Sequence, residues 1–370
     1  MIIGVPKEIK VQEYRVGLTP ASVRELVVQG HEVFIEHEAG IGISCDDAAY
    51  EQVGAVILAT AAEVYAKAEM IVKVKEPQAC EYNLIREGQI LFTYLHLAPD
   101  LAQTEALIKS GCVAVAYETV TDRDGRLPLL APMSMVAGRL SIQAGAYCLE
   151  KPHGGRGILL GGVPGVRPAK VVVIGGGVVG VNAARMAMGM NAEVLVLDKS
   201  HHVLQDLDMH FGGRMQTLYA TEVALEDAVA DADLVIGAVL VPGKAAPKLV
   251  SKELLATMHK GAVLVDVAID QGGCFETSHA TTHDEPSYVT DGIVHYCVAN
   301  MPGAVPRTST FALNNATLPF VLALANKGYK KALSDDPHLL NGLNVCCGKV
   351  SYEAVARDLN KDYTPAIQCI

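Results

Sequence analysis

The chain of 370 residues carries 30 Lys and Arg against 41 Asp and Glu, which gives a net charge of −11, and half of its residues are hydrophobic. This hydrophobicity excludes an intrinsically disordered chain. An acidic balance without a Lys/Arg-rich stripe argues against a nucleic-acid-binding protein. The length predicts two domains, each with its own core, and the absence of Trp favours cores of aliphatic residues, as in buried parallel sheets.

Short apolar runs alternate with helical segments through the first third of the chain. The helix expected over residues 21–28 is typical: Thr19 and Pro20 supply its cap and first turn, and Gly30 follows its end. Strands separated by helices predict βαβ units and a parallel sheet. We expect these strands at Ile2–Val5, Val33–Ile35, Met70–Val74, Ile90–Tyr94 and Cys112–Tyr117.

A second α/β series follows a glycine-rich stretch at residues 154–165. Long helices expected at Met135–Glu150 and Thr308–Asn326 would carry the chain between domains, and the remainder of the C-terminal part is expected to be helical only. The sequence therefore predicts two Rossmann-like, doubly wound α/β domains with parallel sheets and a cleft between them. Residues 1–130 with 307–370 form the expected substrate domain, and residues 131–306 the expected NAD-binding domain. The strands of the second series are expected at Val171–Ile174, Val194–Leu197, Leu234–Val239 and Val263–Ala268.

A glycine motif in the second series predicts a dinucleotide site. The strand Val171–Ile174 leads into Gly175, Gly177 and Gly180, a helical run follows, and Asp198 ends the next strand 18 residues after Gly180. Strand, glycine turn, helix and acid in this order are typical of dinucleotide-binding folds. Asp198 would accept hydrogen bonds from ribose hydroxyls and repel a 2′-phosphate, which favours NAD over NADP. The alternative interpretation is a tightly packed glycine turn beside a surface Asp.

Polar residues follow several of the expected strands, where the carboxyl ends of parallel strands form binding sites. Taken singly, each is more often a solvated strand end than a catalytic group. Taken together they describe one cationic and one acid/base pocket. The residues are Arg15, Lys73, Lys75, His96, Glu118, Asp266 and Asp270.

The nine cysteines show no C-x-x-C pair and no zinc-site spacing, so we interpret them as small buried hydrophobic residues in a reducing compartment. The N-terminus lacks the pattern of a signal peptide, and no apolar run reaches the ~18 residues of a membrane span. A soluble, cytoplasmic protein without membrane partners is the expectation.

Motifs along almost the whole chain resemble those of bacterial L-alanine dehydrogenases, within the alanine dehydrogenase/transhydrogenase family. Near the start they are Gly4–Ile9 and Glu13–Val16, followed by Lys73–Pro77, Leu91–Leu97 and Pro132–Ser134. The later blocks are Gly161–Val166, Gly237–Gly243, Val265–Gly273 and Cys297–Pro302.

The resemblance implies NAD-dependent, reversible oxidative deamination of L-alanine to pyruvate and ammonium, carried out by a homohexamer. It assigns substrate binding to Arg15 and Lys75, proton transfer to His96, and a second catalytic role to Asp270. It also implies no metal, because Ala323 and Lys327 stand where some members hold an ion. For the cofactor it implies Ser134, Gly175, Gly177, Val178, Val179, Gly180, Asp198, Val239, Leu240, Val267, Ala268, Ile269, Asp270, His279, Val298, Ala299, Asn300 and Met301.

Two positions depart from the family pattern at the adenosine end: Val203 stands where some members have a basic residue, and His279 where some have Arg. Two other functions stay open. One is a non-catalytic, NAD-binding subunit of the transhydrogenase type, which the joint presence of Arg15, Lys75, His96 and Asp270 disfavours. The other is a dehydrogenase of another small amino acid, such as serine or aminobutyrate, because one methylene is discriminated by only ~1–3 kcal/mol.

Overall fold

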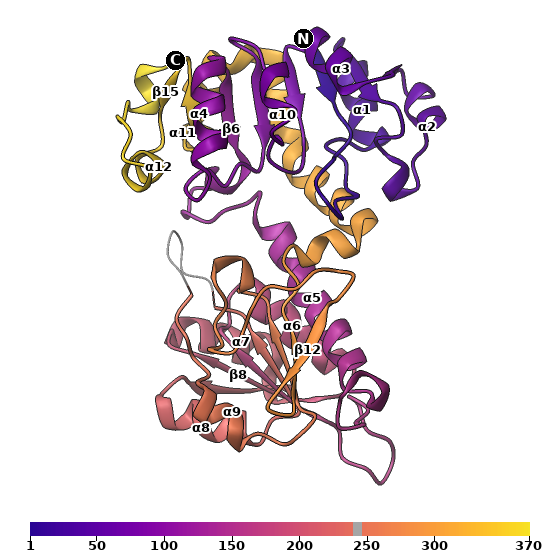
Figure 1. The fold of residues 1–370 in the computed structure, drawn as a ribbon, viewed down its shortest axis with the longest axis vertical. Helices are drawn as coiled ribbons and strands as arrows, with labels where there is room; N and C mark the ends of the chain where they lie inside the picture. The colour runs from indigo at the N-terminus through magenta and orange to yellow at the C-terminus, as the bar shows by residue number, and fades with distance from the viewer. Residues whose placement is uncertain (240–245) are drawn as a thin grey trace. The chain divides into compact units, whose positions relative to one another are not determined.

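The computed structural model describes residues 1–239 and 246–370 and divides into two compact units (Figure 1). Unit 1 comprises Met1–Met133 and Val305–Ile370, and unit 2 comprises Ser134–Ala304. Each unit is a sheet flanked by helices, which confirms the expected α/β class with two domains. Within the described residues, no helix is both long and apolar enough to cross a membrane.

Unit 1 is built on an eight-stranded sheet with the order β15-β14-β6-β5-β4-β1-β2-β3. Strands β1 to β6 pair in parallel with their neighbours among these six. At one edge, β14 pairs antiparallel with β6, and β15 pairs antiparallel with β14. The strands are β1 (Ile2–Val5), β2 (Glu32–Glu36), β3 (Val56–Leu58), β4 (Met70–Val72), β5 (Ile90–Thr93), β6 (Val113–Ala116), β14 (Leu343–Cys346) and β15 (Lys349–Val350).

The expectation of helices alone in the C-terminal part is wrong, because β14 and β15 lie there. All four residues of β14 are buried, and this strand is defined by its pairing with β6 rather than by a local pattern. Four residues are too few to reveal a strand period in the sequence.

Helices cover both faces of the unit 1 sheet. On one face, Val64, Leu107 and Val355 pack with sheet residues such as Leu91. Helix α10, in the C-terminal part of the chain, is linked to the start of α1. Its Asn314 side chain accepts hydrogen bonds from the Thr19 amide at 2.8 Å and the Ser22 hydroxyl at 2.9 Å. The helices are α1 (Pro20–Val28), α2 (Asp47–Glu51), α3 (Ala61–Lys67), α4 (Leu101–Ser110), α10 (Pro306–Asp335), α11 (Pro337–Leu340) and α12 (Glu353–Asp358).

Unit 2 holds a seven-stranded sheet with the order β12-β13-β11-β10-β7-β8-β9. All neighbours pair in parallel except β12, which runs antiparallel to β13 at the edge and was not expected from the sequence. The strands are β7 (Lys170–Ile174), β8 (Glu193–Asp198), β9 (Gln216–Tyr219), β10 (Leu234–Gly237), β11 (Val263–Asp266), β12 (Ser287–Thr290) and β13 (Ile293–Tyr296).

Two helix layers also enclose the unit 2 sheet. Val229 and Leu255 pack with strand residues such as Val235 on one face. On α5, a Cβ added at Gly138 would lie 2.2 Å from the Val179 carbonyl oxygen, so α5 and α6 lie in close backbone contact. The helices are α5 (Ala131–Cys148), α6 (Val178–Gly189), α7 (His201–Phe211), α8 (Glu222–Ala230) and α9 (Lys252–Thr257).

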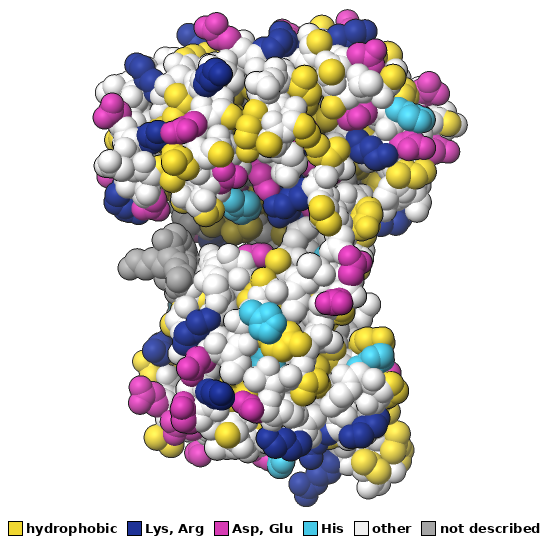
Figure 2. All heavy atoms as spheres, viewed as in Figure 1, with side chains coloured by type: hydrophobic (Ala, Val, Ile, Leu, Met, Phe, Trp, Pro, Cys, Tyr) yellow, Lys and Arg dark blue, Asp and Glu magenta, His cyan; other side chains and the backbone are white. Residues whose placement is uncertain are grey.

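The surface is of mixed character, and the exposure of two cysteines differs from the sequence interpretation. Figure 2 shows acidic, basic and hydrophobic side chains mixed over the visible face of each unit. All nine cysteines are free thiols, but Cys80 and Cys347 are exposed rather than buried. Position in a turn or loop, not residue type, decides the exposure of these two side chains.

Candidate active site

Four polar residues predicted from the sequence follow four neighbouring strands of unit 1. Arg15 comes after β1, Lys75 after β4, His96 after β5 and Glu118 after β6, and these strands are adjacent in the order β6-β5-β4-β1. Since the carboxyl ends of parallel strands share one edge, the fold gathers these residues on that edge.

Arg15 is held in a fixed orientation by its neighbour Glu13. The guanidinium is 2% exposed, and its Nε and Nη2 each lie 2.6 Å from a different Glu13 carboxylate oxygen. Its Nη1 donates to the Met133 sulfur at 3.0 Å. Burial alone would lower the pKa of Arg15, but the bond to Glu13 raises it, so the guanidinium stays charged. Sequence reasoning missed Glu13, although its place two residues before Arg15 was a signal.

The two lysines after β4 have different environments. Lys73 is fully buried, and its Nζ lies 3.0 Å from Glu81 and 3.2 Å from Glu8. Glu8 uses its other oxygen to accept the backbone amides of Val74 at 2.6 Å and Lys75 at 3.1 Å. Lys73 is therefore a structural cation rather than the pocket residue that the sequence left possible.

Lys75 is partly buried, and its ammonium has no hydrogen-bond or ion-pair partner within residues 1–239 and 246–370. Burial lowers the pKa of Lys75, and the positive charge of Arg15 lowers it further. A sheltered cation without a partner, beside a second cation, is a favourable place for an anionic ligand.

Lys73→Met should destabilise the protein by about 3–5 kcal/mol, because it leaves Glu8 and Glu81 buried without their cation. The matched control is Lys75→Met, which removes no ion pair and should cost less than about 1 kcal/mol. Urea unfolding of both variants measures the difference. Equal losses of the free energy of unfolding in the two variants would contradict the distinction between the lysines.

His96 presents an exposed imidazole on a constrained backbone. Its φ of 50° lies in the left-handed region, and its amide donates to Glu118 at 2.6 Å. The ring stacks on Tyr94, with centroids 5.8 Å apart and planes at 7°, and the Tyr94 hydroxyl donates to the Leu129 carbonyl at 2.6 Å. Glu118 also accepts the Leu95 amide at 3.2 Å and has an oxygen 3.9 Å from His96 Nδ1, so it positions the His96 backbone and lies beside the imidazole.

The residues expected to bind the cofactor follow successive parallel strands of unit 2. The glycine loop comes after β7, Asp198 ends β8, and further residues come after β10, β11 and β13, in the sheet order β13-β11-β10-β7-β8. The sheet order reverses its direction of growth between β7 and β10, which is the usual dinucleotide position in open α/β sheets.

The glycine loop has a shape that side chains would prevent. Gly175 has a φ of +99°, and a Cβ added at Gly180 would lie 1.8 Å from the Gly175 carbonyl oxygen. Asp198 accepts the Gly176 amide at 2.7 Å and the Ser200 amide at 2.8 Å. The loop leads into α6, whose first amide groups lack a side-chain cap and are suited to a pyrophosphate.

The other expected cofactor residues lie around this loop or follow neighbouring strands. A Cβ on Gly175 would lie 3.2 Å from the Val239 side chain, whereas Leu240 falls outside the described residues. His279 is exposed and stacks on Tyr288, with ring centroids 3.7 Å apart. Ser134 lies in α5; Val267, Ala268, Ile269 and Asp270 follow β11; Val298, Ala299, Asn300 and Met301 follow β13.

Asp266 serves the backbone rather than chemistry. It is fully buried and accepts the Ser278 hydroxyl at 2.6 Å, the Cys274 amide at 2.9 Å and the Ala268 amide at 3.1 Å. With its lone pairs engaged in this way, it shapes the loop that carries Asp270. Asp266 was one of the strand-end candidates for a pocket, and in the structure its carboxylate binds the loop.

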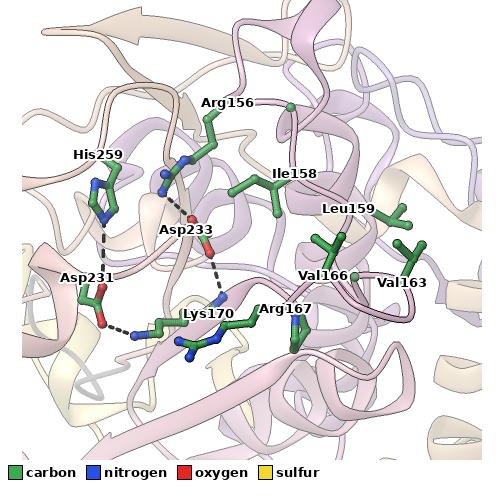
Figure 3. A pocket seen from close by; sticks show the side chains of 13 residues that line it. Arg156, Ile158, Leu159, Val163, Val166, Arg167, Lys170, Asp231, Asp233 and His259 are labelled. Carbon is green, nitrogen blue, oxygen red and sulfur yellow. Dashed lines mark hydrogen bonds and ion pairs between the residues drawn. The ribbon is translucent and has the colours of Figure 1, made fainter.

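A pocket of about 550 Å³ lies at the opposite edge of the unit 2 sheet, by the amino ends of β7, β10 and β11 (Figure 3). Its charges are largely paired: Arg156 lies 2.6 Å from Asp233, Lys170 pairs with Asp231, and His259 lies 4.0 Å from Asp231. The length of the strands separates this pocket from the glycine loop, so we assign it no part in dinucleotide binding.

Family models match nearly the whole chain. The model described as "Alanine dehydrogenase/PNT, N-terminal domain" matches residues 4–137, and "Alanine dehydrogenase/PNT, C-terminal domain" matches residues 141–353. The chain belongs to the alanine dehydrogenase/PNT family. The chain is similar to an alanine dehydrogenase of Halomonas elongata, with 60% identical residues over 100% of both chains. The resemblance noted from the sequence motifs is thereby confirmed.

Solved structures agree with this membership of the alanine dehydrogenase/PNT family. An L-alanine dehydrogenase superposes with a TM-score of 0.95 at 55% identity, over 97% of this chain and 99% of the other. A transhydrogenase from Sinorhizobium meliloti superposes with a TM-score of 0.84 at 23% identity, over 95% and 100% of the two chains. The likeness to the transhydrogenase, at 23% identity, shows a shared fold alone. Because the identity to the alanine dehydrogenase is far higher, a transhydrogenase-like subunit is not favoured.

Proposed function

We propose that this chain catalyses the NAD-dependent, reversible oxidative deamination of L-alanine to pyruvate and ammonium. The full-length similarity to alanine dehydrogenases carries the proposal. The sheltered, unpartnered Lys75 beside the fixed Arg15 supports it independently, because two cations suit a substrate with a carboxylate and a second oxygen. In this proposal unit 1 binds the substrate and unit 2 binds NAD.

Arg15 binds the substrate carboxylate, and Glu13 fixes the plane in which its guanidinium lies. Lys75 faces the oxygen that develops on the α-carbon and stabilises the negative charge there. His96 transfers protons as water adds to the α-carbon and ammonia leaves, which its exposed imidazole allows. Asp270 acts as the second catalytic group and orients the water or the amine.

The residues of unit 2 fit NAD. The glycine loop and the uncapped start of α6 suit a pyrophosphate, and Asp198 retains lone pairs for ribose hydroxyls beyond the two amides that it binds. When bound there, NAD would supply the hydride acceptor for the reaction at the substrate α-carbon. The overall reaction consumes one water and releases ammonium, pyruvate, NADH and a proton.

The test is to mix the purified protein with NAD and L-alanine at alkaline pH and follow NADH absorbance in the near ultraviolet. Serine and 2-aminobutyrate, run in parallel with each of NAD and NADP, measure the substrate and cofactor preferences. A lack of NADH with L-alanine, together with a rise on another amino acid, would replace the proposed substrate. A homohexamer in the cytoplasm is proposed from the family resemblance, and light scattering should give six chains per particle.

The affinity for pyruvate should fall as the pH rises, and this fall should occur at a lower pH than the titration of an unperturbed lysine would give. Burial and Arg15 lower the pKa of Lys75, so its ammonium loses its proton, and with it the attraction for the keto oxygen, below the usual lysine range of about 10.4. Lys75→Arg keeps its charge throughout and should remove this inflection. The measurement is the inhibition constant of pyruvate against L-alanine from about pH 7 to 10.5. Identical pH dependence in both proteins would show that another group titrates.

A further inference from the structure

Residues 271–275, immediately after Asp270, are held through five successive carbonyl groups. The Ala246 amide donates to the Gln271 carbonyl at 3.0 Å, and the Leu249 amide donates to the Cys274 carbonyl at 2.7 Å. Lys248 Nζ donates to the other three, those of Gly272 at 2.6 Å, Gly273 at 2.9 Å and Phe275 at 3.1 Å. The segment 246–249 thus binds all five backbone carbonyls of residues 271–275.

The Lys248 ammonium is matched to this task. It has three protons and meets three carbonyl oxygens, so its donors are fully used although the residue is exposed. Asp266 binds the same loop through the opposite groups, the amides of Ala268, Cys274 and Phe275. A cation on the carbonyls and an anion on the amides fix the loop from both sides.

Asp270 depends on this fixation. It is exposed, it lies in the short 3-10 turn Ile269–Gln271, and its carboxylate has no hydrogen-bond or ion-pair partner in the described part of the chain. Its position is therefore set by its backbone alone. Displacing a reacting group by about 1 Å can cost about a hundredfold in rate.

We propose that Lys248 is a positioning residue for Asp270, an inference that rests on the proposed function in so far as Asp270 is catalytic. Lys248 acts through the carbonyls of Gly272, Gly273 and Phe275 and does not contact the substrate. No pattern in the sequence distinguishes it from other lysines.

The test compares Lys248→Met with Lys252→Met. Lys252 lies four residues later at the start of α9, is exposed, and its side chain has no partner within the described residues. Lys248→Met should lower kcat for L-alanine by about ten- to hundredfold with little change in KM, because Arg15 and Lys75 lie in unit 1. Lys248→Arg, which keeps a cation but not its three-donor shape, should fall between Lys248→Met and the wild type.

Hydrogen exchange provides a readout that does not depend on activity. In Lys248→Met the amides of residues 268–275 should exchange at least about tenfold faster, while those of residues 175–180 keep their rates. Lys252→Met should match the wild type in both measurements. Unchanged exchange in residues 268–275, or faster exchange with unchanged kcat, would overturn the positioning role. If the wild type oxidises no L-alanine, the proposed function fails, and exchange still tests whether Lys248 holds the loop.

Discussion

Replacing His96 by Asn should lower turnover with L-alanine by about 10²- to 10⁴-fold, the usual effect of losing a general acid–base group. The imidazole is half exposed, stacks on Tyr94 and has its Nδ1 3.9 Å from a Glu118 carboxylate oxygen, so its loss should not damage the core. Asn is the sharper substitution than Ala because the backbone here is left-handed, with a φ of 50°, and Asn tolerates that conformation.

The measurement is kcat in both directions, together with the dissociation constant of NAD. NAD binding should stay within about threefold of the wild-type value, since the glycine loop and Asp198 lie in unit 2. The matched variant is Glu118→Gln, which keeps an oxygen acceptor for the His96 amide and should reduce kcat far less. Near-normal turnover in His96→Asn would remove the imidazole from the mechanism.

Removing the charge of Asp198 should weaken the preference of the protein for NAD over NADP. Charge-assisted hydrogen bonds to ribose hydroxyls contribute ~1.5–3 kcal/mol each, and a 2′-phosphate would meet a like charge instead. The wild type should therefore prefer NAD over NADP by at least about 10²-fold in kcat/KM, because 1.4 kcal/mol is already tenfold. Asp198→Asn should relax this ratio, and Lys199, the next residue, can then pair with the 2′-phosphate.

The structure separates two roles of Asp198 that one substitution would confuse. Its carboxylate also accepts the Gly176 and Ser200 amides, so Asp198→Ala loses the support of the glycine loop as well as the charge. Asp198→Asn keeps one oxygen acceptor. We expect Asp198→Ala to lose more NAD affinity than Asp198→Asn, with the KM for L-alanine unchanged in both. A constant ratio of NAD to NADP efficiency in Asp198→Asn would place the ribose partner elsewhere.

The amino-acid sequence by itself determined the α/β class, the glycine loop and the acid at the end of the following strand. Each depends on neighbouring residues: apolar runs of strand length, helix caps such as Thr19, and the fixed spacing from Gly175 to Asp198. The return of the C-terminal part to the first domain was also predicted from two long helices; in the structure Val305–Ile370 belongs to unit 1, and the Thr19 amide donates to the Asn314 side chain.

Only the tertiary structure decided which polar residues are structural. Lys73 and Lys75 are the same residue type at one strand end, and they differ because Glu8 and Glu81 approach Lys73 from other parts of the chain. Likewise Glu118 and Asp266 bind backbone amides, and Lys248 reaches carbonyls about 25 residues away in sequence. A buried charge takes its role from the partners that folding brings to it, and no local pattern shows a partner as remote in sequence as Glu8 is from Lys73.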